Sequence, residues 1–342
     1  MYTPEDLEEA VDRGIFTRDA VTQFQAHVVA RGLPGHKVDE EQFRLISGFN
    51  DIFVVIACVL MLVSTLWIGI SLAPKSALLA TGLVAWGQAE CFVRRRRMAL
   101  PAIVLLLAFT ASMAGLAFVL AALDEGFSGV FVVLGAAALA AWVHWLRFRV
   151  PMAVALCAGA VLCATGLFVM SLLAGADAIR IQDMGTFGNM VFFACGVAAF
   201  MMAMRWDMQD PARISDKSDI AFWLHMLAAP LLVHPVFSNM ALTAADGVGP
   251  LQALSVVLLY GVIGIVSLAI DRRALMVAAL SYVLAVFANL LLRYGVVNMN
   301  FAVTALVVGT ALLLLSVFWH RMRARVMAVL PGGIVRRLPR LR

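Results

Sequence analysis

The sequence is poor in charged residues. Asp, Glu, Lys and Arg make up 14% of its 342 residues, whereas about 25% is usual in a soluble domain. Hydrophobic residues make up 63% of the chain, and the mean hydropathy is +0.94. A soluble globular protein is therefore excluded. The net charge of +5 does not indicate a nucleic-acid reader, because the basic residues lie in short clusters between long apolar runs, as in a multi-pass membrane protein.

Sequence signals for metal binding and catalysis are also missing. The five cysteines all fall in apolar runs without CxxC spacing, so we expect them to be small core residues. HExxH, GxSxG and Walker-type motifs are absent. His225 and His234 are about 13.5 Å and half a turn apart on an ideal helix, which disfavours a shared metal or haem. No metal, cofactor or catalytic residue is predicted, and an enzyme acting on lipids is only the third hypothesis.

The apolar runs divide the chain into segments of spanning length. A helix needs about 20 apolar residues to cross the bilayer core, and a β-barrel would need alternation that is not seen. The predicted fold is an all-α polytopic membrane helix bundle with about ten transmembrane helices. A count of ten also permits two inverted halves of five helices. The segments are roughly 50–72, 76–93, 99–122, 128–146, 151–174, 185–204, 219–242, 250–270, 274–293 and 299–320.

Two polar regions flank the predicted membrane domain of residues 49–320. Residues 1–48 predict a helical hairpin, in which Gly14 ends one helix and Thr17 begins the next. Its apolar stripes are narrow, so we expect it to lean on the membrane domain or to dock a cytoplasmic protein partner. Residues 321–342 form a basic tail beside the membrane lipids, which serves as a topology signal. The acidic N-terminus lacks the apolar core of a cleavable signal peptide.

The distribution of positive charge predicts the orientation. With ten spans and a cytoplasmic N-terminus, 23 of the 26 Lys and Arg residues fall in cytoplasmic segments. Only Lys75, Arg180 and Arg293 remain outside. Both termini are therefore predicted to be cytoplasmic.

The region before the first span resembles that of a known group of membrane proteins. Gly14-Ile-Phe-Thr-Arg-Asp-Ala, and the stretches that begin at Glu41 and Ser218, resemble a group of uncharacterised bacterial multi-pass inner-membrane proteins with a short N-terminal helical hairpin. The resemblance covers about 70 residues. It implies location in the bacterial inner membrane and a similar architecture, but no activity, because that group has none to transfer.

Ionisable side chains within the spans are candidate functional residues, because each is costly in lipid. Most gather on the predicted cytoplasmic side, where they form a polar cluster. Glu90 is also spaced to form an ordinary ion pair with Arg94, and Asp51 to be an ordinary helix-start acid. The cytoplasmic-side residues are Asp51, Glu90, His144, Asp219 and His225.

The seventh span contains the second candidate site. Pro230 and Pro235 remove backbone donors near mid-membrane, beside His234, and broken helices of this kind form substrate sites in many transporters. A structural kink explains the same prolines. Polar residues near the outer face could add to a substrate site, although Arg293 is equally explained by an interfacial position. The substrate-binding hypothesis comprises His234, His225, Asn239, Asn289 and Arg293.

Two functions compete at this stage. The first is a transporter or flippase for a small solute or a lipid, which requires a cavity near Pro230 and Pro235. The second is a non-catalytic scaffold or sensor whose hairpin docks a cytoplasmic partner, for which a solid core suffices. The transported species, the coupling ion and the oligomeric state are not encoded in any recognisable motif.

Overall fold

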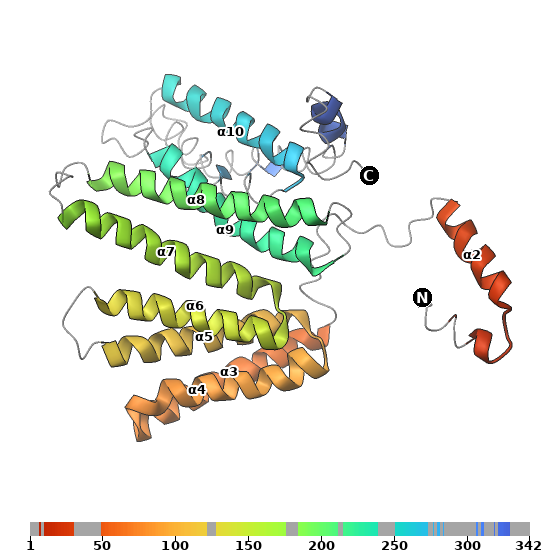
Figure 1. The fold of residues 1–342 in the computed structure, drawn as a ribbon, viewed down its shortest axis with the longest axis horizontal. Coiled ribbons are helices and arrows are strands. Elements are labelled where there is room, and N and C mark those ends of the chain that lie inside the picture. Colours follow the sequence, from red (N-terminus) through yellow and green to blue (C-terminus); the bar gives the residue numbers. More distant parts are fainter. Residues whose placement is uncertain are drawn as a thin grey trace. The chain divides into compact units, whose positions relative to one another are not determined.

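The computed structural model divides the chain into two compact units, residues 1–42 and 43–342. It describes residue 7, residues 10–30, 49–121, 128–175, 184–210, 215–238, 250–272 and 321–328, and a few positions between 276 and 318. Within these ranges every regular element is helical (Figure 1).

The first unit contains the helix α2 (Arg18–Ala30). Gly14 has φ 69°, a left-handed conformation that suits glycine. Thr17 accepts a hydrogen bond from the Ala20 amide at 3.2 Å, which is an N-cap contact. The predicted helix start at Thr17 and the predicted role of Gly14 are thus confirmed. Three large apolar side chains of this unit, Ile15, Phe16 and Phe24, are exposed.

The second unit contains seven helical segments, among the described residues, that are long and apolar enough to cross a membrane. They correspond to the first seven predicted spans, and the architecture is compatible with an integral membrane protein. The next helix, α10, coincides with the eighth prediction. The predicted spans 274–293 and 299–320 lie mostly outside the described residues, so the count of ten and the inverted halves stay predictions. The helices are α3 (Phe49–Leu72), α4 (Pro74–Ala89) continued by the π-helix η1 (Glu90–Arg95), α5 (Ala99–Ala121), α6 (Ser128–Phe148), α7 (Pro151–Gly175), α8 (Met184–Gln209), α9 (Asp216–Ser238) and α10 (Pro250–Ile270).

The helices pack with their chain neighbours, and α9 is the most enclosed of them. Half of its most apolar stretch is buried, against 11% for α3. Helix α9 contacts both α7 and α8, and it runs beside α8 in Figure 1. Helices α3, α4, α5 and α7 meet around a separate apolar core that includes Leu62, Ala85, Leu105 and Ala153. The enclosed position of α9 makes it the helix around which a functional site is best sought.

The two prolines of α9 lie inside a continuous helix. Asp216–Ser238 is helical throughout, with Pro230 exposed and Pro235 buried. Helix α8 approaches this stretch closely at Gly196. A Cβ there would lie 2.8 Å from the carbonyl carbon of Leu231, the residue whose oxygen loses its helical donor to Pro235. The turn that Pro235 weakens is therefore covered by the backbone of α8.

Candidate functional site

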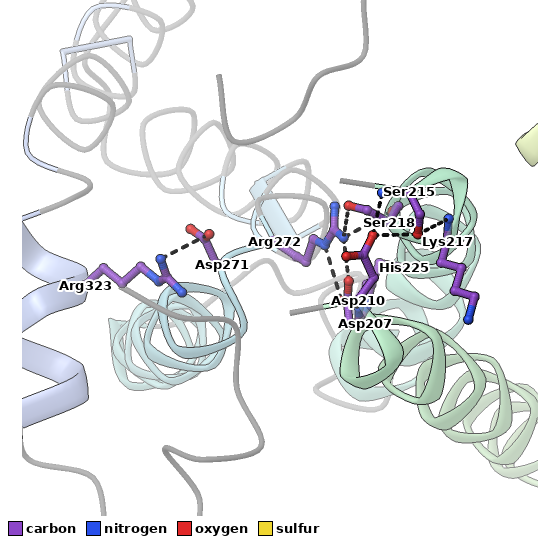
Figure 2. Close-up of polar contacts among 9 residues, drawn as sticks. All are labelled: Asp207, Asp210, Ser215, Lys217, Ser218, His225, Asp271, Arg272 and Arg323. Carbon is purple, nitrogen blue, oxygen red and sulfur yellow. Dashed lines mark hydrogen bonds and ion pairs between the residues drawn. The ribbon is translucent and has the colours of Figure 1, made fainter. Parts of the chain in front are cut away.

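Three ionisable side chains from the end of α8, the first half of α9 and the turn after α10 meet in the second unit (Figure 2). They are Asp207, His225 and Arg272, which we call the buried charge cluster. Their exposed fractions are 3%, 0% and 2%. The three helices bring together residues that are 18 and 65 positions apart in the chain. Such complete burial of charge needs internal partners, and the cluster supplies them.

Asp207 is the centre of the cluster. Its Oδ1 accepts a hydrogen bond from Arg272 Nη2 at 2.5 Å, and its Oδ2 lies 2.9 Å from His225 Nε2. Arg272 Nε adds a longer contact to Oδ2 at 3.4 Å. One carboxylate thus joins the side chains of two other helices. Removing it would leave a buried guanidinium without its counter-ion, which is strongly unfavourable.

Arg272 also holds the first turn of α9. Its Nη2 donates to the Ser218 carbonyl at 3.2 Å and lies 3.4 Å from the Ser218 hydroxyl. The guanidinium therefore links α8 and α9 from the end of α10. Asp219, which follows Ser218 in α9, is half-buried and close enough to Arg272 to interact with it electrostatically. The ring of Phe200 packs edge-on against His225 at 5.4 Å between centroids.

The residue before Arg272 makes an ion pair in a different direction. Asp271 is buried and its Oδ2 lies 3.1 Å from Arg323 Nη1. Its φ is 61°, so the chain turns in a left-handed conformation where α10 ends. Figure 2 shows Asp271 directed toward Arg323 and Arg272 directed toward Asp207. This turn connects α10 to the helical residues 321–328 on one side and to the cluster on the other.

Glu90 forms the predicted ion pair and a second one that the sequence does not suggest. It lies 3.3 Å from Arg94, as the spacing predicts, and it also pairs with Arg147 of α6 at 2.6 Å and 3.0 Å. The Glu90 side chain is 30% exposed. A half-exposed, bidentate pair of this kind fastens η1 to α6 and is explained without a ligand.

His144 is fully buried in an aromatic setting. Its ring lies 4.5 Å from Phe148 and 6.0 Å from both Trp86 and Phe109, between centroids. Neither ring nitrogen finds a hydrogen-bond partner among the described residues. Asp51, from the same predicted cluster, is buried at the start of α3. The sequence-predicted cytoplasmic-side group is thus distributed over several separate contacts, and of its members His225 lies in the buried charge cluster.

The candidate substrate residues around the prolines are placed differently. His234 has an exposed side chain on α9. Asn239, Asn289 and Arg293 lie outside the described residues. His225 joins the buried charge cluster, nine positions before His234, so the two histidines belong to different environments.

Sequence reasoning missed Asp207 and Arg272. Helix α8 extends to Gln209, past the predicted end at 204, and this extension brings Asp207 into the bundle. Arg272 was counted only as an orienting positive charge. One signal was available in the sequence. Asp207 lies between the apolar residues Trp206 and Met208, which indicates that the helix continues through this acid into the bundle.

An apolar groove lies between α7, α8 and α9. Its volume is about 330 Å³. Charged side chains are absent from its described lining, and Cys163 and Phe192, at its exposed part, are accessible from outside. We call it the apolar groove. Its lining residues are Gly159, Leu162, Cys163, Gly166, Leu167, Met170, Gly188, Val191, Phe192, Cys195, Leu227 and Leu231.

Neither feature resembles a metal or cofactor site. In the described residues no group of three His, Cys, Asp or Glu side chains is placed to hold a metal ion. Comparisons with protein-family models, with curated proteins and with solved structures found no match.

Proposed function

We propose that the protein is an integral membrane transporter, a carrier or flippase for a small solute or a lipid, and that the buried charge cluster is its moving part. The observation that supports this most is the complete burial of Asp207, His225 and Arg272 where the membrane-length helices α8 and α9 meet the end of α10. Ionisable residues within a membrane bundle commonly mark ion or substrate pathways. An imidazole bonded to a carboxylate is also a group that can relay a proton.

The geometry gives the cluster a means to switch. Asp207 holds α9 through His225 and α10 through Arg272. Protonation or displacement of one partner would leave the others buried and uncompensated, which favours a second arrangement of the helices. The apolar groove on the other face of α9 would change shape with such a movement, because Leu227 and Leu231 line it. The proposed orientation, with both termini in the cytoplasm, places the cluster at the cytoplasmic side.

Water access to buried positions of α9 tests this proposal without knowledge of the substrate. In a cysteine-free background, Ala228, Ala229 and Val233 are replaced one at a time by cysteine and exposed to a charged, water-soluble thiosulfonate in membrane vesicles. All three are almost completely buried. A transporter that opens around α9 should expose at least one of them, because thiolates react with the charged reagent only in water.

Two controls make the result decisive. Lys217→Cys, at an exposed position at the start of α9, should react fully. Ala153→Cys is also fully buried but lies in the separate apolar core around α5, and it should stay protected. Protection of all three α9 positions, or equal reaction at Ala153→Cys, would contradict the transporter.

The alternative function is a scaffold or sensor that docks a cytoplasmic protein through the first unit. The observation in its favour is the exposure of Ile15, Phe16 and Phe24 on that unit, because a cluster of exposed apolar side chains commonly marks an interaction surface. Protection of α9 in the experiment above, together with loss of cellular function on Phe16→Ser and Phe24→Ser, would favour the scaffold.

A further inference from the structure

We infer that the apolar groove binds one acyl chain of a membrane phospholipid. This assignment does not depend on the proposed transport function. The groove could hold an acyl chain permanently, without moving the lipid across the membrane. The groove is distinct from the buried charge cluster. Leu227 and Leu231 of α9 contribute to it, whereas His225 faces Asp207 of α8.

The first argument is the position of the groove. All its lining residues belong to α7, α8 and α9, within segments that are long and apolar enough to cross a membrane. The lining on α7 runs from Gly159 to Met170, near the middle of the span Pro151–Leu173. At this depth the surroundings are hydrocarbon, so a charged or strongly polar occupant would be costly.

The second argument is the chemistry of the walls. The lining consists of Gly, Leu, Cys, Met, Val and Phe side chains. It thus offers van der Waals contact but no charge to pair with an anionic or cationic group. Exposed Cys163 and Phe192 place its accessible part toward the outside of the bundle. A molecule within the bilayer can therefore enter sideways.

The third argument is the shape. Gly159 to Met170 spans about 16 Å of helix axis. Spread over that length, the volume of 330 Å³ corresponds to a mean cross-section of about 20 Å². An extended hydrocarbon chain, one methylene across, fits such a narrow groove. The shape therefore favours an acyl chain as the occupant, and a second copy packed over the groove is an outcome that the test distinguishes.

One of the glycines that line the groove, Gly188, leaves open space in front of it. A Cβ on Gly188 would meet no atom within 4 Å, so a larger side chain there would fill the groove without displacing the backbone. Gly185, one turn earlier on the same helix, has equally open surroundings but does not line the groove. Gly188→Leu and Gly185→Leu are thus paired variants, because both add the same side chain to α8 and only one of them fills the groove.

Photolabelling of the full chain in vesicles tests the assignment. The probe is a phosphatidylethanolamine with a diazirine midway along one acyl chain. Light expels dinitrogen from the diazirine, and the carbene inserts into a nearby protein bond. We expect adducts to concentrate on residues 159–170 and 188–195, above the level on the exposed positions Leu60 and Trp67 of α3. Labelling of the groove should fall several-fold in Gly188→Leu and stay unchanged in Gly185→Leu.

Two results would overturn the assignment. The first is labelling that is no denser in the groove than on α3, or that Gly188→Leu leaves unchanged. The second is efficient crosslinking of two copies through Cys163 by a short bismaleimide, in a chain whose other cysteines are serine, because a second copy would then cover the groove. Labelling measures binding and the thiol experiment measures opening, so failure of one proposal leaves the other to be judged separately.

Discussion

Asp207 determines the energetics of the buried charge cluster. A single carboxylate serves as acceptor for both His225 and Arg272, at 2.9 Å and 2.5 Å. Glu90 makes a similar pair of contacts, but its side chain is 30% exposed. Exposed ion pairs contribute about 0–1 kcal/mol, whereas breaking a buried pair by removing one partner costs about 3–5 kcal/mol. Burial therefore separates two groups that look alike in the sequence.

Replacement of Asp207 should consequently destabilise the protein much more than replacement of Glu90. We expect Asp207→Ala to lower the free energy of unfolding by about 3–5 kcal/mol and Glu90→Gln by about 0–1 kcal/mol. Unfolding in mixed micelles, titrated with sodium dodecyl sulfate, gives both values. The double variant Asp207→Ala with Arg272→Met should lose less than the sum of the single variants, because the uncompensated charge is gone. Equal effects of Asp207→Ala and Glu90→Gln would show that the cluster is not buried in the membrane.

Helices α8 and α9 owe their close contact to one small residue. At Gly196 a Cβ would stand 2.8 Å from the Leu231 carbonyl carbon and 2.9 Å from the Leu232 nitrogen. These are backbone atoms, which cannot rotate away as a side chain does. Close approach through small residues is the usual basis of helix association in membranes. The contact also falls on the turn of α9 that Pro235 weakens.

A methyl group at this position should separate the two helices. We expect Gly196→Ala to cost about 1–3 kcal/mol, the usual range for overpacking. Gly185→Ala, in the first turn of the same helix with open surroundings, should change the free energy of unfolding by about 0.5 kcal/mol or less. The same micelle titration measures both. Similar values for the two variants would mean that α8 and α9 do not approach each other at Gly196.

At the scale of the whole molecule, antiparallel helices bring several ion pairs to one end of the second unit. Glu90 pairs with Arg94 within η1 and with Arg147 at the end of α6. Asp207 pairs with Arg272 where α8, α9 and the end of α10 meet. The division of Lys and Arg along the sequence predicts that this end lies on the cytoplasmic side. Arg272 and Arg323 therefore contribute both to the predicted orientation and to internal ion pairs.

Reporter fusions test the proposed orientation. A reporter after Arg97 should give a cytoplasmic signal, and reporters after Glu125 and Asp246 should give periplasmic signals, because positive-inside statistics favour that threading. Alkaline phosphatase and a fluorescent protein, which are active on opposite sides, provide the measurement. A periplasmic signal at Arg97 would reverse the proposed orientation. The buried charge cluster would then lie on the periplasmic side.

The sequence alone determined where most of the described helices lie, though not every helix end. Helix length, the absence of alternation, and caps such as Thr17 and Gly14 depend on neighbours along the chain, so the first seven spans and the start of α2 could be predicted from it. The Glu90–Arg94 pair follows from helical spacing for the same reason. His225 could be singled out as an expensive side chain, but its partners could not be identified.

Tertiary structure decided which of these residues act together. Asp207 and Arg272 are 65 positions apart, and their meeting depends on how far α8 extends and how α10 ends, which no local pattern specifies. The apolar groove depends on how α7, α8 and α9 pack against one another, and the contact at Gly196 on where α8 meets α9. Local chemistry fixes each helix, whereas a site between helices exists only once packing has chosen which faces meet.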